Sequence, residues 1–170
     1  MMASTRSADL PAYLQNYLRK ARGRTVLEAQ QNALVRTVAL FGDIGEERGS
    51  YRYAPGKWSI KEVLQHLNDC ERIFTYRALR FARNDATALP PFEENEYTQA
   101  SEADRSPLTS ILTEHKAIRA STLALFASFT PVMMARAGLA SGNTMSVEQL
   151  GLIAAGHAEH HCDIHEERYL

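Results

Sequence analysis

The chain has 170 residues, of which 45% are hydrophobic and 23% are charged, and its formal net charge is −1. This composition is ordinary for a globular protein, and we expect one domain over residues 1–170. The charge gives no footprint for nucleic acid, the apolar runs are too short to span a bilayer, and two cysteines make no disulfide framework. With no signal-peptide pattern at the N-terminus, these features predict a cytoplasmic protein that contacts neither nucleic acid nor membrane.

Helical patterns fill the first half of the chain. Residues 10–22 predict a short helix with Pro11 in its first turn, and residues 25–48 predict a longer one. A loop follows over residues 49–56. Ser59 and Glu62 then form a capping box, and the apolar stripe behind them predicts a helix that runs into residue 83.

The second half contains two more long helices. Residues 84–106 include two adjacent prolines, and a connection of this length is typical of a functional loop or a crossover. Ser106 as N-cap, followed by Pro107, predicts a helix that ends before Pro131. A second capping box at residues 146–149 begins the last helix. Four long helices, no convincing strand and one long crossover predict an all-α four-helix bundle.

Four of the six histidines gather in the last predicted helix, from His157 to His165. His157 and His161 are i and i+4, and they replace apolar residues on the stripe that must face the core. His66 lies on the inward face of the earlier capped helix. Neutral imidazoles are good ligands for divalent metals, and three of them leave coordination positions open, as in catalytic sites. The candidate metal ligands are therefore His66, His157 and His161, holding zinc, nickel or iron.

Two other interpretations are open at this stage. Spacing alone also allows the pairs His161/His165 and His157/His160, although residues 160 and 165 lie nearer the edge of the stripe. Alternatively, each histidine is a core residue hydrogen-bonded to a carbonyl or carboxylate, with no metal. Glu159 cannot complete a zincin motif, because it projects to the opposite side of the helix from His157.

Two roles are possible for several residues near these histidines. Asp69, one turn after His66, is either a carboxylate that orients that imidazole or a solvated charge. Cys70 and Cys162 are expected to be buried apolar residues rather than ligands. The capped helix also carries Arg72, Arg77 and Arg80. We expect these arginines to form a solvated or salt-bridged face of that helix rather than an anion-binding site.

The segment YRYAPGKWSIKEVLQHLNDCERIFTYRALRFARND (51–85) resembles the DinB-like superfamily, in its bacillithiol-transferase-like branch. The resemblance continues through LPPFEENEYTQAS (89–101) and SVEQLGLIAAGHAEHHCDIHEERYL (146–170). It implies a four-helix bundle, often dimeric, with a divalent metal held by the same three histidines. The family is associated with metal-dependent hydrolases and with transferases that join low-molecular-weight thiols to electrophiles.

The leading hypothesis is therefore a metal-dependent enzyme, either a thiol S-transferase or a hydrolase. Its expected partners are a small-molecule thiol or another small substrate and a second copy of the chain, as a homodimer. The metal would activate either the thiol or a water molecule. The alternative hypothesis is a non-catalytic, stress-associated module in which a bound ion mainly stabilises the bundle.

Overall fold

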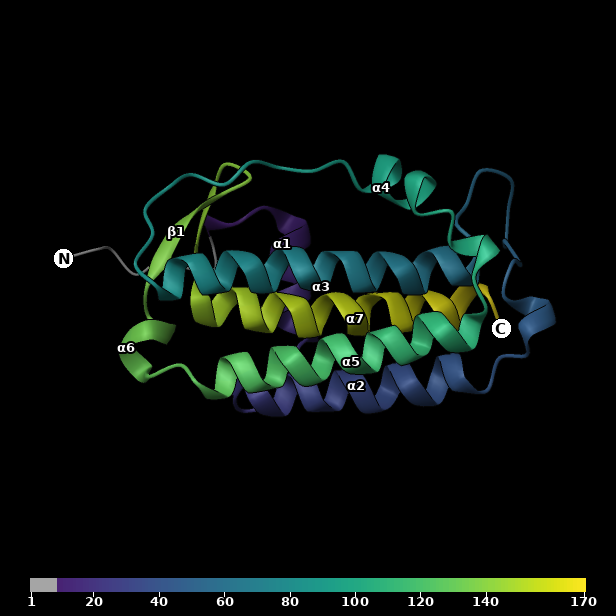
Figure 1. The fold of residues 1–170 in the computed structure, drawn as a ribbon, viewed down its shortest axis with the longest axis horizontal. Coiled ribbons are helices and arrows are strands. Elements are labelled where there is room, and N and C mark those ends of the chain that lie inside the picture. The colour runs from purple at the N-terminus through teal and green to yellow at the C-terminus, as the bar shows by residue number, and fades with distance from the viewer. Residues whose placement is uncertain (1–8) are drawn as a thin grey trace.

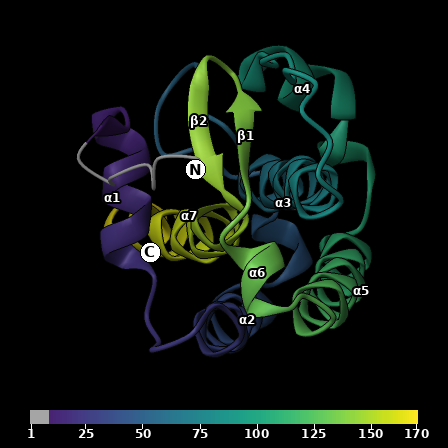
Figure 2. The same ribbon diagram turned by 90° about the vertical axis from the view of Figure 1, so that its left-hand side faces the viewer.

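The computed structural model describes residues 9–170 and contains a bundle of four long helices (Figure 1). These are α2 (Val26–Gly42), α3 (Ile60–Ala82), α5 (Leu108–Ala127) and α7 (Val147–Arg168). Around the bundle the order is α2, α7, α3, α5, so that α2 and α3 lie diagonally opposite (Figure 2). The predicted all-α four-helix bundle is confirmed.

The direction of the helices explains the long crossover. α3 and α5 are neighbours that run the same way, whereas α2 and α7 run the opposite way (Figure 1). The chain must therefore return along the length of the bundle between α3 and α5, and residues 83–107 do so along the outside of α3. This crossover contains a short helix, α4 (Glu94–Ser101), and a 3-10 turn at Ala103–Arg105, which the sequence did not predict.

Both predicted capping boxes are confirmed. The Ser59 hydroxyl accepts a hydrogen bond from the Glu62 N–H at 3.1 Å, and the Glu62 carboxylate accepts one from the Ser59 N–H at 2.8 Å. Ser146 and Gln149 make the same reciprocal pair at the start of α7. Because these caps fix where α3 and α7 begin, they also fix the height at which each histidine sits in the bundle.

The N-terminus of α5 differs from the prediction. Ser106 does not cap it; the first helical residue is Leu108, and its N–H donates to Oε2 of Glu46 at 2.7 Å. Glu46 begins a 3-10 turn, Glu46–Arg48, which follows the end of α2 at Gly42, so the helix predicted over residues 25–48 was also too long. A carboxylate from a distant turn satisfies the N–H group that the serine was expected to satisfy.

The expectation of a strand-free chain is wrong between α5 and α7. β1 (Ala137–Ala140) and β2 (Asn143–Ser146) form an antiparallel hairpin, and Leu89 of the crossover pairs with the end of β1. The hairpin turn holds Ser141 and Gly142 at φ values of 50° and 75°, as a tight two-residue turn requires. Strands of four residues without alternating β-branched side chains lack the pattern by which strands are recognised in a sequence.

α1 (Ala12–Lys20) lies outside the four-helix bundle and packs along α7 (Figure 2). It confirms the helix predicted over residues 10–22, with Pro11 as its N-cap residue rather than in its first turn. The two helices approach most closely at Gly156, where a Cβ atom would lie only 1.8 Å from the carbonyl oxygen of Tyr17. A residue without a side chain is therefore required at this position for α1 to sit on α7.

The buried apolar side chains form two clusters that follow one another along the bundle. One joins α1, the hairpin, the second half of α3 and the first half of α7, with the turn of helix α6 (Pro131–Met134) packed against it. The other joins α2, α5 and the remaining halves of α3 and α7. The clusters meet between Leu67 and Cys70 on α3, beside His66. Within residues 9–170, no helix combines the length and apolar character needed to cross a membrane.

We expect Gly156→Ala to lower the free energy of unfolding by about 2 kcal/mol, because the added methyl group forces the backbone of α1 away from α7. Thermal unfolding followed by circular dichroism measures this effect. Gly42→Ala is the matched control, since a Cβ atom there would meet Leu112 Cδ2 at an ordinary 3.8 Å. The control should be neutral or slightly stabilising, and equal melting temperatures for Gly156→Ala and the parent would contradict the close approach described above.

Candidate metal centre

Three imidazoles from two helices meet inside the bundle. α3 supplies His66, and α7 supplies His157 and His161, one helical turn apart. The Nε2 atoms of His66 and His157 are 3.0 Å apart, and one nitrogen from each of the three rings lies within 4.8 Å of the others. The ring centroids are 4.7 to 5.0 Å apart and the ring planes cross at 68° to 86°, so the rings stand edge to face around a shared space.

Burial keeps these three imidazoles uncharged. His66, His157 and His161 are only 3%, 4% and 9% exposed. Burial lowers the pKa of His66 to about 4. Burial, reinforced by the charges of neighbouring imidazoles, holds the pKa of His157 and of His161 well below 6.5. At neutral pH each ring therefore carries a free lone pair, which is the form that binds a metal ion.

The nitrogen spacing fits a divalent ion. Two zinc–nitrogen bonds of about 2.05 Å at a tetrahedral angle place their nitrogens about 3.3 Å apart. The 3.0 Å contact between His66 and His157 lies close to that value, and small ring rotations would bring the His161 nitrogen to it. The donor set of three neutral imidazoles suits zinc, nickel or iron. The residues present therefore fit the metal that the sequence predicts.

Aromatic rings enclose the cluster. The Trp58 ring lies 4.6 Å from the His66 ring and stacks on His161 at 6.4 Å with an angle of 21° between the planes. On the side of α1, the Tyr17 ring lies 5.0 Å from the His157 ring. These aromatic rings pack directly on the imidazoles and so restrict the orientations that the imidazoles can take.

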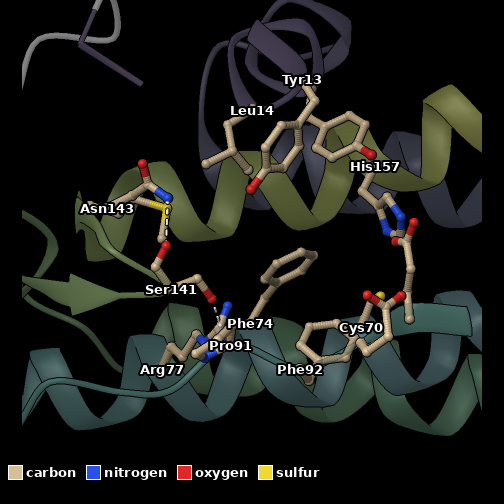
Figure 3. Close-up of a pocket in the computed structure, with 14 residues that line it drawn as sticks. Tyr13, Leu14, Cys70, Phe74, Arg77, Pro91, Phe92, Ser141, Asn143 and His157 are labelled. Carbon is tan, nitrogen blue, oxygen red and sulfur yellow. Dashed lines mark hydrogen bonds between the residues drawn. The ribbon is translucent and has the colours of Figure 1, made fainter. Parts of the chain in front are cut away.

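A cavity of about 500 Å³ reaches the cluster at His157 (Figure 3). It is bounded by α1, α3, the crossover and the hairpin, so it depends on the crossover and hairpin as much as on the bundle. Cys70, Phe74 and Arg77 follow one another along its α3 side, and Figure 3 shows Arg77 and His157 toward opposite ends with Phe74 between them.

A second, smaller hollow of about 220 Å³ reaches the cluster at His161. Tyr53, Trp58 and Asn95 are among the residues that line it. The three-histidine cluster therefore borders two separate hollows, one at His157 and the other at His161.

One carboxylate that lines the large cavity, that of Glu94, raises the pKa of two side chains that touch the cluster. Burial, and then the charge of Glu93, raises the pKa of Glu94. After burial, Glu94 is the largest influence that raises the pKa of Tyr17 and of Cys70. Tyr17 packs on His157, and the Cys70 sulfur lies 3.6 Å from both ring nitrogens of His66, so the charge of Glu94 acts on two residues that touch the cluster.

With the fold and the site described, comparison with known proteins identifies the family. Residues 27–164 match the family model of the DinB superfamily. The chain belongs to the DinB superfamily. Its structure is similar to that of YfiT from Bacillus subtilis, with 15% sequence identity, a TM-score of 0.73, and coverage of 91% of this chain and 84% of that one. YfiT is described as a probable metal-dependent hydrolase with an unusual four-helix bundle topology. A search of curated proteins gave no match.

The other histidines at the end of this DinB chain lie outside the cluster. His160 is partly exposed and packs beside the Tyr17 ring at 5.4 Å. His165 is fully buried rather than near the edge of the stripe, 4.8 Å from the Phe41 ring and stacked on Tyr169 with 4° between the ring planes. The alternative pairs that the spacing allowed are therefore not the ones that the fold brings together with His66.

Two carboxylates near the cluster face away from it. Asp69 accepts a hydrogen bond from Gln65 at 3.0 Å and lies 3.9 Å from an Arg72 nitrogen, so the idea that it orients His66 is wrong. Glu159 accepts a hydrogen bond from Arg36 at 2.7 Å on the side of α7 that faces α2, as its position in the sequence predicts. The two cysteines are buried and free, so their predicted burial is confirmed.

The three arginines of α3 lie in different surroundings. The prediction of a solvated or salt-bridged face is wrong for Arg77. Arg72 pairs with Glu114 at 2.5 Å, and Arg80 pairs with Asp85, as expected for a salt-bridged face. Arg77 is only 5% exposed and lines the large cavity. Its burial depends on the crossover and the hairpin, whose positions no local pattern in α3 could reveal.

We expect the protein, purified without added metal, to contain about one divalent ion per chain. Replacing His66, His157 or His161 by alanine should each remove most of it, because two imidazoles bind far more weakly than three. His160→Ala is the matched control and should retain the ion, since that ring lies outside the cluster. Elemental mass spectrometry measures the content, and a near-stoichiometric ion in His161→Ala would contradict this assignment.

The burial of His165 predicts that the free energy of unfolding depends on pH, independently of metal binding. Burial lowers its pKa to about 4, against about 6.5 in the unfolded chain. Between these values only the unfolded state binds the proton, so stability is complete above about pH 6.5 and is lost as the pH falls toward 4. Phenylalanine can keep the stacking on Tyr169 without titrating. Denaturant unfolding at pH 7.5 and pH 5 should show His165→Phe losing about 2 kcal/mol less than the parent, and equal losses would contradict the prediction.

Proposed function

We propose that this chain is a divalent-metal-dependent enzyme that acts on a small molecule, with His66, His157 and His161 as its protein ligands to the metal. The observation that carries the proposal is that three buried, neutral imidazoles surround one space at the wall of a 500 Å³ cavity. Three protein ligands are the number of a catalytic zinc site, whereas structural sites use four. A purely stabilising ion would not require a cavity at its side, which favours the enzyme over the non-catalytic module.

A divalent ion held there would act as a Lewis acid. It would lower the pKa of a bound water molecule to about 7, and it would deprotonate a bound thiol. The protein's own part is to hold the imidazoles rigid and to exclude bulk water with Trp58 and Tyr17. Glu94 supplies a carboxylate at the same cavity, and its raised pKa makes it a better proton acceptor than a glutamate with an ordinary pKa. We assign Glu94 the role of accepting the proton of the nucleophile.

Two reactions suit this arrangement, and each has its own support. Transfer of a small thiol to an electrophile needs room for two molecules, and the hollows at His157 and His161 provide two places beside one cluster. Hydrolysis needs only one substrate and water, and the similarity to YfiT supports it. We favour thiol transfer, because a hydrolase leaves the hollow at His161 without a use.

The proposal is tested by metal-dependent turnover. Consumption of cysteine or glutathione with monochlorobimane, and hydrolysis of p-nitrophenyl acetate, are measured before and after chelation and after zinc or nickel is returned. Glu94→Gln should lower kcat about 100-fold at unchanged metal content, because the cavity loses its proton acceptor. Glu96→Gln, the same change at a residue of α4 that does not line the cavity, should leave kcat unchanged.

The possible results separate the two versions. Metal-dependent loss of thiol without ester hydrolysis would establish the transferase version, and the reverse result would establish the hydrolase version. No metal-dependent turnover in either assay, with one ion bound per chain, would overturn the enzymatic proposal and return the site to a stabilising role.

A further inference from the structure

Arg77 is a buried cation that has no carboxylate partner. Within residues 9–170 three cationic side chains are buried: Lys61, Arg77 and Arg119. Lys61 pairs with Glu46, and Arg119 pairs with Glu71 at 2.9 Å. Arg77 makes no ion pair with any described residue. An unpaired charge removed from water is costly, so a buried arginine without a counter-ion indicates that the counter-ion comes from a ligand.

The hydrogen bonds of Arg77 leave part of its guanidinium group free. Nη2 donates to the Pro90 carbonyl oxygen at 2.9 Å and to the Ser141 hydroxyl at 2.8 Å. These two bonds tie the crossover to the tip of the hairpin, and they explain a structural role for the side chain. They do not neutralise its charge, and Nε and Nη1 make no hydrogen bond to the described residues, although a guanidinium group has five N–H donors. Burial accordingly lowers the pKa of Arg77.

The position of Arg77 places that charge inside the large cavity at a defined distance from the histidines. Cys70, Phe74 and Arg77 are i, i+4 and i+7 on α3, so they form one stripe along the cavity (Figure 3). Seven residues of helix separate the Cα atoms of Cys70 and Arg77 by about 10 Å. Cys70 contacts His66, so a ligand that reaches from the histidines to Arg77 must be an extended molecule of roughly that length.

The walls between these two ends are aromatic. Phe74 and Phe92 line the cavity, and the Phe92 ring centroid lies 5.9 Å from the Arg77 guanidinium carbon. Glu94 adds a negative charge to the lining of the same cavity, and this charge disfavours a second anionic group on the ligand. The cavity is thus suited to a molecule that is anionic at the Arg77 end, apolar in the middle and uncharged at its reacting end.

We propose that Arg77 binds the carboxylate of an extended, apolar organic acid, whose opposite end reaches the three histidines. This inference rests on the proposed function, because it assigns a substrate class to the same cavity. Arg77 is then a specificity-determining residue, and it neither contacts the reacting atoms nor holds the metal.

The test compares phenylbutyrate with its neutral amide, phenylbutyramide, which has nearly the same shape. Isothermal titration is performed on the protein as isolated and again after chelation, so that a carboxylate bound to a metal ion is told apart from one bound to Arg77. We expect the acid to bind roughly tenfold or more tightly than the amide in both states, as a charge-assisted hydrogen bond implies. Arg77→Met, which keeps the apolar stem, should remove this preference.

Three further variants separate anion binding from the structural bonds of Arg77. Ser141→Ala removes one of the Nη2 bonds but keeps the cation, so it should retain the preference for the acid. Arg80→Met removes a cation of the same helix that already pairs with Asp85, and it should behave like the parent. Arg77→Lys keeps a charge at the site and should retain part of the preference, which provides a measurement if Arg77→Met does not fold.

Equal binding of acid and amide by the parent, no binding of either, loss of the preference on chelation, or its persistence in Arg77→Met would each overturn the inference. The outcome is independent of the activity assays. A preference that depends on Arg77, together with no metal-dependent turnover, would overturn the proposed function alone. Turnover without any preference for the acid would overturn this inference alone.

Discussion

The bundle has to bury three imidazoles together, and the packing and the ion pairs around them have to offset the cost of doing so. Transfer of an imidazole from water to an apolar core costs about 1 to 3 kcal/mol when its hydrogen bonds are not replaced. The two apolar clusters, which lie on either side of the histidines along the bundle, bury the apolar surface that offsets this cost. Further polar bonds hold the helices together at the same time: Arg36 of α2 binds three carboxylates of α7, and the buried Arg119–Glu71 pair joins α5 to α3. These bonds therefore hold the helices that carry the histidines in place before any ion enters the site.

The elements outside the bundle add a cavity beside the three histidines. α1 can lie against α7 only because Gly156 has no side chain, and the contact brings Tyr17 onto His157. The crossover adds carboxylates to the lining of the cavity, and the hairpin closes one end of it around a buried cation. The resulting cavity is lined by charges of both signs and by aromatic side chains. Such polarity orients a ligand as well as binding it.

Much of the fold, and the residues that form the histidine cluster, could be predicted from the sequence, because helix starts and helix faces follow local rules. The capping boxes at Ser59 and Ser146 fixed the starts of α3 and α7, and the i, i+4 spacing placed His157 and His161 on one face. What could not be predicted depends on contacts between distant segments. Glu46 rather than Ser106 satisfies the start of α5, and Arg77 is buried by elements that have no pattern of their own. The family resemblance agreed with the spacing on the three histidines, but it gave no signal for the cation at the far end of the cavity.

The order of the helices also has a kinetic consequence. α1 and α2 pack on α7, and the Arg36–Glu159 bond joins residues 123 positions apart in the chain. Such separations give a high contact order for a helical protein, so we expect slower folding than in an up-and-down bundle of the same size, whose neighbouring helices are also neighbours in sequence. His66 and His157 are themselves 91 residues apart and meet only when α7 docks. A metal ion at these histidines would therefore not nucleate the fold; it would bind a chain that is already almost native, and it would slow unfolding far more than it speeds folding.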